Sequence, residues 1–155
     1  MALSVGQPAP NFSLYDTSKQ KISLTDFKGK NVVLLFFPLA FSGTCTKELC
    51  EIQENYSVYK NMNAEIIGIS VDSLFTNGKF KEVYNLEFPL LSDFNRETIT
   101  AYDNVLPTFA FEYQGVSRRS VFVIDSEGII RYMEQLPSPG DFPNMAALKD
   151  AVAAL

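Results

Sequence analysis

The chain has 155 residues, of which 46% are hydrophobic and 20% charged, and these values predict one globular domain over residues 1–155. Its formal net charge of −5 provides no basic patch for nucleic acid or for an anionic membrane surface. The sequence contains no histidine, which excludes a Ser-His-Asp triad, a Cys-His catalytic pair and a histidine metal site.

The N-terminal segment, MALSVGQPAP, lacks the basic region and the long apolar stretch of a signal peptide. The most apolar run, Val32 to Phe37, continues only to Phe41, whereas a bilayer span takes about 20 residues. We therefore expect a cytoplasmic protein with no membrane partner, in a compartment where thiols are kept reduced.

The first part of the chain predicts a hairpin followed by a buried strand. On both sides of DTSKQK, apolar residues alternate with polar ones, as in an antiparallel hairpin: Phe12, Leu14, Ile22 and Leu24. The run NVVLLFF, residues 31–37, is apolar without interruption, which is typical of a strand covered on both faces. Pro38 ends its hydrogen-bond ladder.

A helix is predicted to begin between Ser42 and Thr44. Its apolar face repeats at helical spacing through Leu49, Ile52, Tyr56 and Tyr59. Cys45 lies four residues before Leu49 and shares this face. Cys50 is rotated away from Cys45 by about 140°, at about 100° per residue.

The middle of the chain continues the alternation of strands and helices. AEIIGISVD, residues 64–72, predicts a second buried strand, and Ser73 is placed to cap a helix that carries Phe80. FPLLSD predicts a short edge strand, and residues 96–102 one or two helical turns. Residues 103–118 are rich in aromatic side chains, match neither period and predict a long functional loop, with Pro107 in a trans peptide bond.

The end of the chain predicts a hairpin and a final helix. SVFVID and GIIRYMEQL flank a turn over residues 125–128. The tail helix has one apolar face, made of Met145, Leu148, Val152 and Leu155. The whole order favours an α/β fold, with a mixed central sheet, helices on both faces and an N-terminal β-hairpin extension.

Cys45 and Cys50 are the only cysteines, within the stretch PLAFSGTCTKELC. Cys45 falls in the first turn of a helix, where free backbone N–H groups and the helix dipole stabilise a thiolate and favour a nucleophile. Two cysteines alone cannot complete a tetrahedral zinc shell, so a metal site would need carboxylates or a second subunit. Cys50 as an ordinary core residue stays open, because free cysteines are often buried.

The spacing of the cysteines bears on a disulfide between them. In an ideal helix, Cα atoms five residues apart are separated by roughly 8–9 Å. A disulfide needs about 4.4–6.8 Å between the two Cα atoms. A permanent disulfide is therefore incompatible with an intact helix, and a transient one coupled to local unfolding fits better.

These residues resemble the peroxiredoxin family. PLAFSGTC is similar to its active-site signature, with Pro38, Ser42 and Cys45 at the fixed positions and serine in place of the commoner threonine. CTKELC resembles the Q-type (bacterioferritin-comigratory-protein-like) members, whose resolving cysteine lies five residues after the peroxidatic one. PLAF resembles the E-type alkyl hydroperoxide reductases, which often lack that second cysteine.

The resemblance extends to an arginine and an acid. RSVFVID is similar to the family's R-x-x-F-x-[IV]-D motif, which assigns Arg119 as the catalytic arginine, with Arg118 as its close competitor. Glu48, three residues after Cys45, matches the acid that orients this arginine. Each also has a simpler interpretation, as a solvated arginine or as an acid favoured by the helix dipole.

What the resemblance implies is a thiol peroxidase with a thioredoxin-like fold, acting on hydrogen peroxide and organic hydroperoxides without metal or cofactor. Cys45 would become a sulfenic acid while Ser42 and Arg119 bind the peroxide. Pro38 would shield the sulfur from water. Cys50 would resolve the sulfenic acid as a disulfide, and a thioredoxin- or glutaredoxin-type dithiol would reduce it.

Other interpretations stay open at this point. Cys50 could be a bystander in a one-cysteine mechanism with an external thiol, and the chain could be a redox-sensing interaction module. A thioredoxin-type oxidoreductase fits less well, because it carries C-x-x-C. Ser42 could serve only as a helix N-cap. The aromatic residues Phe109, Phe111 and Tyr113 could line a substrate pocket, although we favour a homodimer contact.

Overall fold

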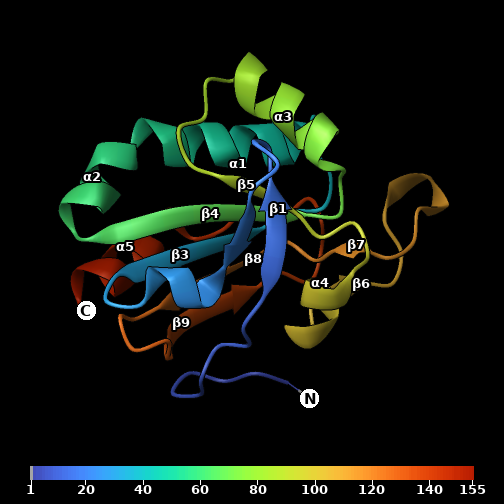
Figure 1. Cartoon of the computed structure of the whole chain (residues 1–155). Coiled ribbons are helices and arrows are strands. Elements are labelled where there is room, and N and C mark those ends of the chain that lie inside the picture. Colours follow the sequence, from blue (N-terminus) through green and yellow to red (C-terminus); the bar gives the residue numbers. More distant parts are fainter. Residues whose placement is uncertain (1) are drawn as a thin grey trace.

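The uninterrupted apolar runs form the centre of the sheet. The computed structural model describes residues 2–155. β3 (Asn31–Phe36) and β4 (Ala64–Ser70) pair in parallel, and nearly all of their side chains are buried. They occupy the middle of a seven-stranded mixed sheet in the order β2-β1-β5-β4-β3-β8-β9 (Figure 1). The remaining strands of this sheet are β1 (Ser13–Asp16), β2 (Lys21–Ser23), β5 (Leu90–Ser92), β8 (Ser120–Ile124) and β9 (Ile130–Gln135).

Helices cover both faces of this sheet, so there is a hydrophobic core on each face. Side chains along β3 alternate between the two cores. Val33 and Leu35 face the core under most of the helices, whereas Val32 and Leu34 face the opposite core. The helices of the first face are α1 (Gly43–Glu54), α2 (Tyr56–Asn61), α3 (Leu74–Val83) and α5 (Met145–Ala153). The second face is covered by the 3-10 turn η1 (Leu24–Phe27) and by α4 (Glu97–Ala101) (Figure 1). The mixed sheet with helices on both faces is therefore confirmed.

The N-terminal hairpin is confirmed, and its position corrects the prediction for β5. β1 pairs with β2 and also, antiparallel, with β5. β5 pairs in parallel with β4 on its other side. The expected edge strand is thus an internal one, because a hairpin more than 60 residues earlier in the chain covers its free side.

The first long helix is interrupted at Asn55. The Asn55 side chain donates to the carbonyl of Glu51 (2.9 Å) and accepts from Lys149 Nζ (2.7 Å). A side chain that hydrogen-bonds to the helix backbone competes with the helix ladder. The apolar face predicted across one helix is consequently shared between α1 and α2, with Tyr59 buried and Tyr56 half-buried.

Residues 103–118 are more ordered than a loop. β6 (Val105–Leu106) and β7 (Val116–Ser117) form a two-stranded antiparallel ribbon, and η2 (Ala110–Glu112) lies at its tip. Strands of two residues are too short to leave a period in the sequence. No peptide bond among residues 2–155 is cis, as expected for Pro107.

The C-terminal hairpin and helix follow the prediction except at Leu155. β8 and β9 pair antiparallel, and Leu148 and Val152 of α5 are buried. Leu155 lies beyond the end of α5 and is 43% exposed, so it does not continue the apolar face. Within residues 2–155, no helix is long and apolar enough to cross a membrane.

Candidate active site

Cys45 lies where the buried strand β3 passes into α1. Pro38 follows the strand and is buried, and the chain turns through residues 39–42. Ser42 occupies the N-cap position of α1, so Cys45 falls in the first helical turn, with its side chain fully buried. This is the location that the sequence predicted for the nucleophile.

Strand pairing places Arg119 beside this helix end. β8 pairs antiparallel with β3, and the register sets Ser120 opposite Phe36, the last residue of β3. Arg119, immediately before Ser120, is therefore held at the same end of the sheet as Cys45. Its Nη2 donates to Cys45 Sγ over 3.3 Å. Arg119, and not Arg118, is the arginine that contacts the sulfur.

Arg119 is fixed by partners from two segments of the chain. Its Nη1 donates to Glu48 Oε1 over 2.7 Å, the contact expected from the resemblance. Its Nη2 also donates to the carbonyl of Pro139 over 3.0 Å, from the loop between β9 and α5. Arg119 Nε is buried and has no partner among residues 2–155. The N–H group at Nε of the guanidinium is thus left for another acceptor.

The charges of this cluster are buried together. Arg119 is 1% exposed and Glu48 is 0% exposed. Burial acts to lower the pKa of Arg119, but the negative charges of Cys45 and Glu48 outweigh it and raise that pKa. The guanidinium therefore stays charged beside the sulfur.

Two opposing effects act on the pKa of the Glu48 carboxyl group. Burial raises the pKa of Glu48 to about 7, against the attraction and hydrogen bond of Arg119 and with added repulsion from Glu134. Its second oxygen, Oε2, has no partner among residues 2–155. The carboxyl group therefore titrates near neutral pH.

This titration gives a prediction for stability. The pKa of Glu48 rises on folding from 4.5 to about 7, so the folded chain binds more protons than the unfolded chain between these pH values. Its contribution to stability is full below the lower value and falls as pH rises towards 7. Glu48→Gln removes that decline, on the order of 3 kcal/mol. Urea unfolding of the reduced protein at a series of pH values measures it.

The matched control is Glu127→Gln, which removes an exposed carboxylate on the turn between β8 and β9. It is expected to keep the wild-type decline. An identical pH dependence in wild type and Glu48→Gln would contradict the buried titration of Glu48.

The Ser42 side chain does not cap the helix, which was the simpler interpretation left open for this residue. Its hydroxyl donates to the carbonyl of Leu39 over 2.9 Å and makes no cap hydrogen bond to α1. Its carbonyl instead accepts from the hydroxyl and the N–H of Thr46. With its proton committed to Leu39, the hydroxyl oxygen keeps lone pairs that can accept a hydrogen bond.

Cys50 lies on the last turns of α1. It is half-buried, and both cysteines are free thiols. Burial and the nearby charge of Glu54 raise the pKa of Cys50. Cys50 is therefore a protonated thiol at neutral pH in the intact helix, away from Arg119 and its charge.

The loop between β9 and α5 was missed as part of the site. It supplies the Pro139 carbonyl to Arg119. In the same loop, the Phe142 ring lies under the ammonium group of Lys47 on α1, with 5.1 Å between Nζ and the ring centre. The segment LPSPGDFPN is rich in proline and has neither the helix nor the strand period. No sequence signal pointed to it.

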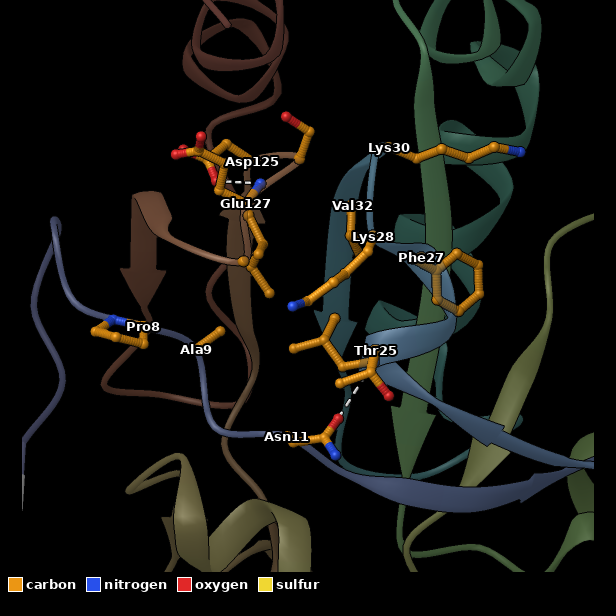
Figure 2. Close-up of a pocket in the computed structure, with 14 residues that line it drawn as sticks. Pro8, Ala9, Asn11, Thr25, Phe27, Lys28, Lys30, Val32, Asp125 and Glu127 are labelled. Atoms are coloured by element: carbon orange, nitrogen blue, oxygen red, sulfur yellow. Dashed lines mark hydrogen bonds between the residues drawn. The ribbon is translucent and has the colours of Figure 1, made fainter.

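A cavity of about 170 Å³ lies at the opposite end of β3. Figure 2 shows it between Pro8 and Ala9 on one side and Thr25 and Lys28 on the other. It contains none of the predicted site residues. Within residues 2–155, no group of three or more cysteine or acidic side chains could hold a metal ion.

Comparison with known proteins decides the family. Residues 5–133 match the AhpC/TSA family. The chain belongs to this family. It is 38% identical to peroxiredoxin Bcp of Bacillus subtilis over 130 residues, which cover 83% of this chain and 82% of the relative. It is 37% identical to alkyl hydroperoxide reductase E of Mycobacterium tuberculosis over 154 residues, 99% of this chain and 98% of the relative.

The fold of this AhpC/TSA protein agrees with solved structures. The crystal structure of peroxidoxin BcpB from Mycobacterium tuberculosis superposes with a TM-score of 0.87 at 24% sequence identity, covering 99% of this chain and 98% of that one. The predicted thioredoxin-like peroxiredoxin fold is confirmed. The chain is an enzyme of the peroxiredoxin type.

Proposed function

We propose that this peroxiredoxin reduces hydrogen peroxide and organic hydroperoxides through the thiolate of Cys45. The observation that carries the proposal is the position of Arg119, which contacts Cys45 Sγ and keeps a buried, unpartnered Nε among residues 2–155. A peroxide oxygen next to the sulfur would accept from this donor. The chemistry needs both thiols reduced between turnovers, which supports the cytoplasmic location that we expected. The single main sheet of seven strands supports one domain over residues 1–155.

The first step is an attack on the terminal oxygen of the peroxide. A bond forms between Cys45 Sγ and this oxygen while the O–O bond breaks. The terminal oxygen keeps its hydrogen, so Cys45 becomes a sulfenic acid, and the other oxygen leaves as an alkoxide or hydroxide that takes a proton from solvent. Arg119 stabilises the charge that develops on the leaving oxygen.

Three neighbours support this step. Ser42 accepts the hydrogen bond of the peroxide O–H, because its own proton is committed to the carbonyl of Leu39. Glu48 orients Arg119 through the bond to Nη1. Pro38 is buried at the end of β3 and shields the sulfur from water.

The second step is resolution by Cys50. Its thiol displaces the oxygen of the sulfenic acid, which leaves as water, and a Cys45–Cys50 disulfide forms. In the reduced structure the two cysteines lie on one helix, five residues apart, so α1 must unwind before the sulfurs can meet. A dithiol of the thioredoxin or glutaredoxin type then reduces the exposed disulfide.

Mass spectrometry after one equivalent of peroxide tests both steps. We expect the peroxide to be consumed, the protein to lose two mass units, and peptide mapping to show a Cys45–Cys50 linkage. The matched variant Cys50→Ser should consume the same equivalent and stop at a sulfenic or sulfinic acid on Cys45. Wild-type protein that behaves like Cys50→Ser would show a one-cysteine mechanism, and wild type that consumes no peroxide would contradict the proposed function.

We also propose that a second copy of the chain covers the tip of the β6–β7 ribbon. Phe111 is 85% exposed and Tyr113 is 53% exposed, and their rings lie 6.2 Å apart. Phe109, by contrast, is half-buried against the core of the same chain. Exposed aromatic pairs are typical of subunit interfaces, which supports a homodimer contact here.

A further inference from the structure

The turn before α1 holds an unfavourable backbone conformation. Leu39, Ala40, Phe41 and Ser42 form a β-turn, closed by a hydrogen bond from the N–H of Ser42 to the carbonyl of Leu39. Phe41, its third residue, has a φ of 69°. Turns with a positive φ at this position prefer glycine, and a bulky side chain there costs free energy. The surrounding structure must therefore hold the turn in place.

Asp72 is the polar group that does so. Its Oδ2 accepts from the N–H of Ala40 over 2.8 Å, in the middle of the turn. Ala40 N–H has no bond within the turn, so this is its tie to the rest of the fold. A carboxylate that accepts from a backbone N–H makes a charge-assisted bond, stronger than one between neutral groups.

Asp72 is itself anchored to the central sheet. The hydroxyl of Ser70, the last residue of β4, donates to Asp72 Oδ2 over 2.7 Å. The hydroxyl of Ser92, the last residue of β5, donates to the carbonyl of Asp72 over 2.6 Å. Two adjacent strands thus fix Asp72, β4 through its carboxylate and β5 through its backbone carbonyl.

The turn also has an apolar contact with α3. The ring of Phe41 lies edge-on to that of Phe80 on α3, with 5.1 Å between ring centres. The Phe41 ring is 46% exposed, so this contact leaves much of it uncovered. The hydrogen bond from the Ala40 N–H to Asp72 is the directional part of the support.

We propose that Asp72 is a positioning residue for the peroxide reaction. Through Ala40 it sets the turn that determines where the Ser42 hydroxyl and the first turn of α1 lie relative to Arg119. This inference rests on the proposed peroxidase chemistry of Cys45. Asp72 does not touch the sulfur, and its effect passes through the backbone of the turn.

The test compares Asp72→Ala with Asp72→Asn in two reactions of Cys45. The first is oxidation by hydrogen peroxide, which needs the positioned Ser42 and Arg119. The second is alkylation by iodoacetamide, which needs the thiolate but not the positioned Ser42 hydroxyl. Both rates are followed by acid quenching and peptide mass spectrometry, so that Cys45 and Cys50 are counted separately.

We expect Asp72→Ala to slow oxidation at least about tenfold, since small displacements at a reacting centre have large effects on rate. Alkylation should stay within about twofold of wild type. Asp72→Asn should oxidise within about threefold of wild type, because its amide oxygen can still accept from Ala40.

Ser73→Ala is the matched control for stability. The Ser73 side chain caps α3 by accepting from Thr76 N–H, over 3.1 Å, and does not touch the turn. Its loss should lower the melting temperature and leave both reaction rates unchanged.

Oxidation of Asp72→Ala within twofold of wild type would overturn the inference. Equal slowing of oxidation and alkylation would do the same, since it would indicate general damage to the helix. Wild-type Cys45 that reacts with peroxide no faster than a free cysteine would instead refute the peroxidase proposal itself.

Discussion

Cys45→Ser is expected to abolish peroxide consumption, leaving only the uncatalysed background. The substitution removes the one sulfur that contacts Arg119, and the serine hydroxyl in its place is a weak nucleophile without an adjacent base. The chain contains no histidine that could act as that base. The measurement is consumption of hydrogen peroxide and of an organic hydroperoxide with a dithiol donor, where we expect a loss of at least about a thousandfold.

The matched control is Cys50→Ser, which changes the other cysteine in the same helix by the same atom. Its first equivalent of peroxide should react at the wild-type rate, because Cys50 acts only after the sulfenic acid has formed. Undiminished turnover in Cys45→Ser would end the assignment of the nucleophile. A loss of the first oxidation in Cys50→Ser would show that the two thiols do not have separate roles.

Arg119→Met is the second change with a large expected effect. It removes the donors next to the sulfur while keeping a long side chain, and the second-order rate constant for Cys45 oxidation should fall about 10²–10³-fold. It also leaves Glu48 buried without its partner, which should destabilise the fold by up to about 3–5 kcal/mol at alkaline pH. Stopped-flow oxidation and urea unfolding, both above pH 7, measure the two effects.

Two further variants separate the effects on rate and on stability. Arg119→Met combined with Glu48→Gln removes both buried charges, so it should recover stability without recovering the rate. Arg118→Met changes the neighbouring arginine, which does not contact Cys45, and should stay within a fewfold of wild type. A slow Arg118→Met beside a fast Arg119→Met would reverse the assignment of the catalytic arginine.

The apolar patterns predicted the central strands correctly, because a strand that is buried on both faces is made of apolar residues throughout. The run from Val32 to Phe37 had no polar residue, and it lies in the middle of the sheet with helices on both sides. Arg119 was assigned through the resemblance of RSVFVID to the family motif, and the pairing of β8 with β3 brings it to Cys45. The motif was sufficient here because the register of these two strands fixes the distant contact.

Features set by long-range contacts were harder to predict. β5 was taken as an edge strand because nothing in its own sequence shows that β1 pairs with it. The break at Asn55 depends on Lys149, 94 residues later in the chain. The helix cap that was left open for the Ser42 hydroxyl does not form, because the turn at Phe41 places the carbonyl of Leu39 within its reach. The Pro139 carbonyl comes from a segment with no period at all.

One consequence follows from the place of Glu48 on the same helical turn as Cys45. If α1 unwinds so that Cys50 can reach Cys45, Glu48 leaves the guanidinium of Arg119 in the same motion. The unwound chain then holds a buried cation without its counter-charge, and this favours the return of the helix once the disulfide is reduced. An unwound α1 would not hold Cys45 beside Arg119, so on the proposed mechanism peroxide capture and resolution by Cys50 would take place in different conformations. The buried ion pair between Glu48 and Arg119 would then favour the intact helix that captures peroxide.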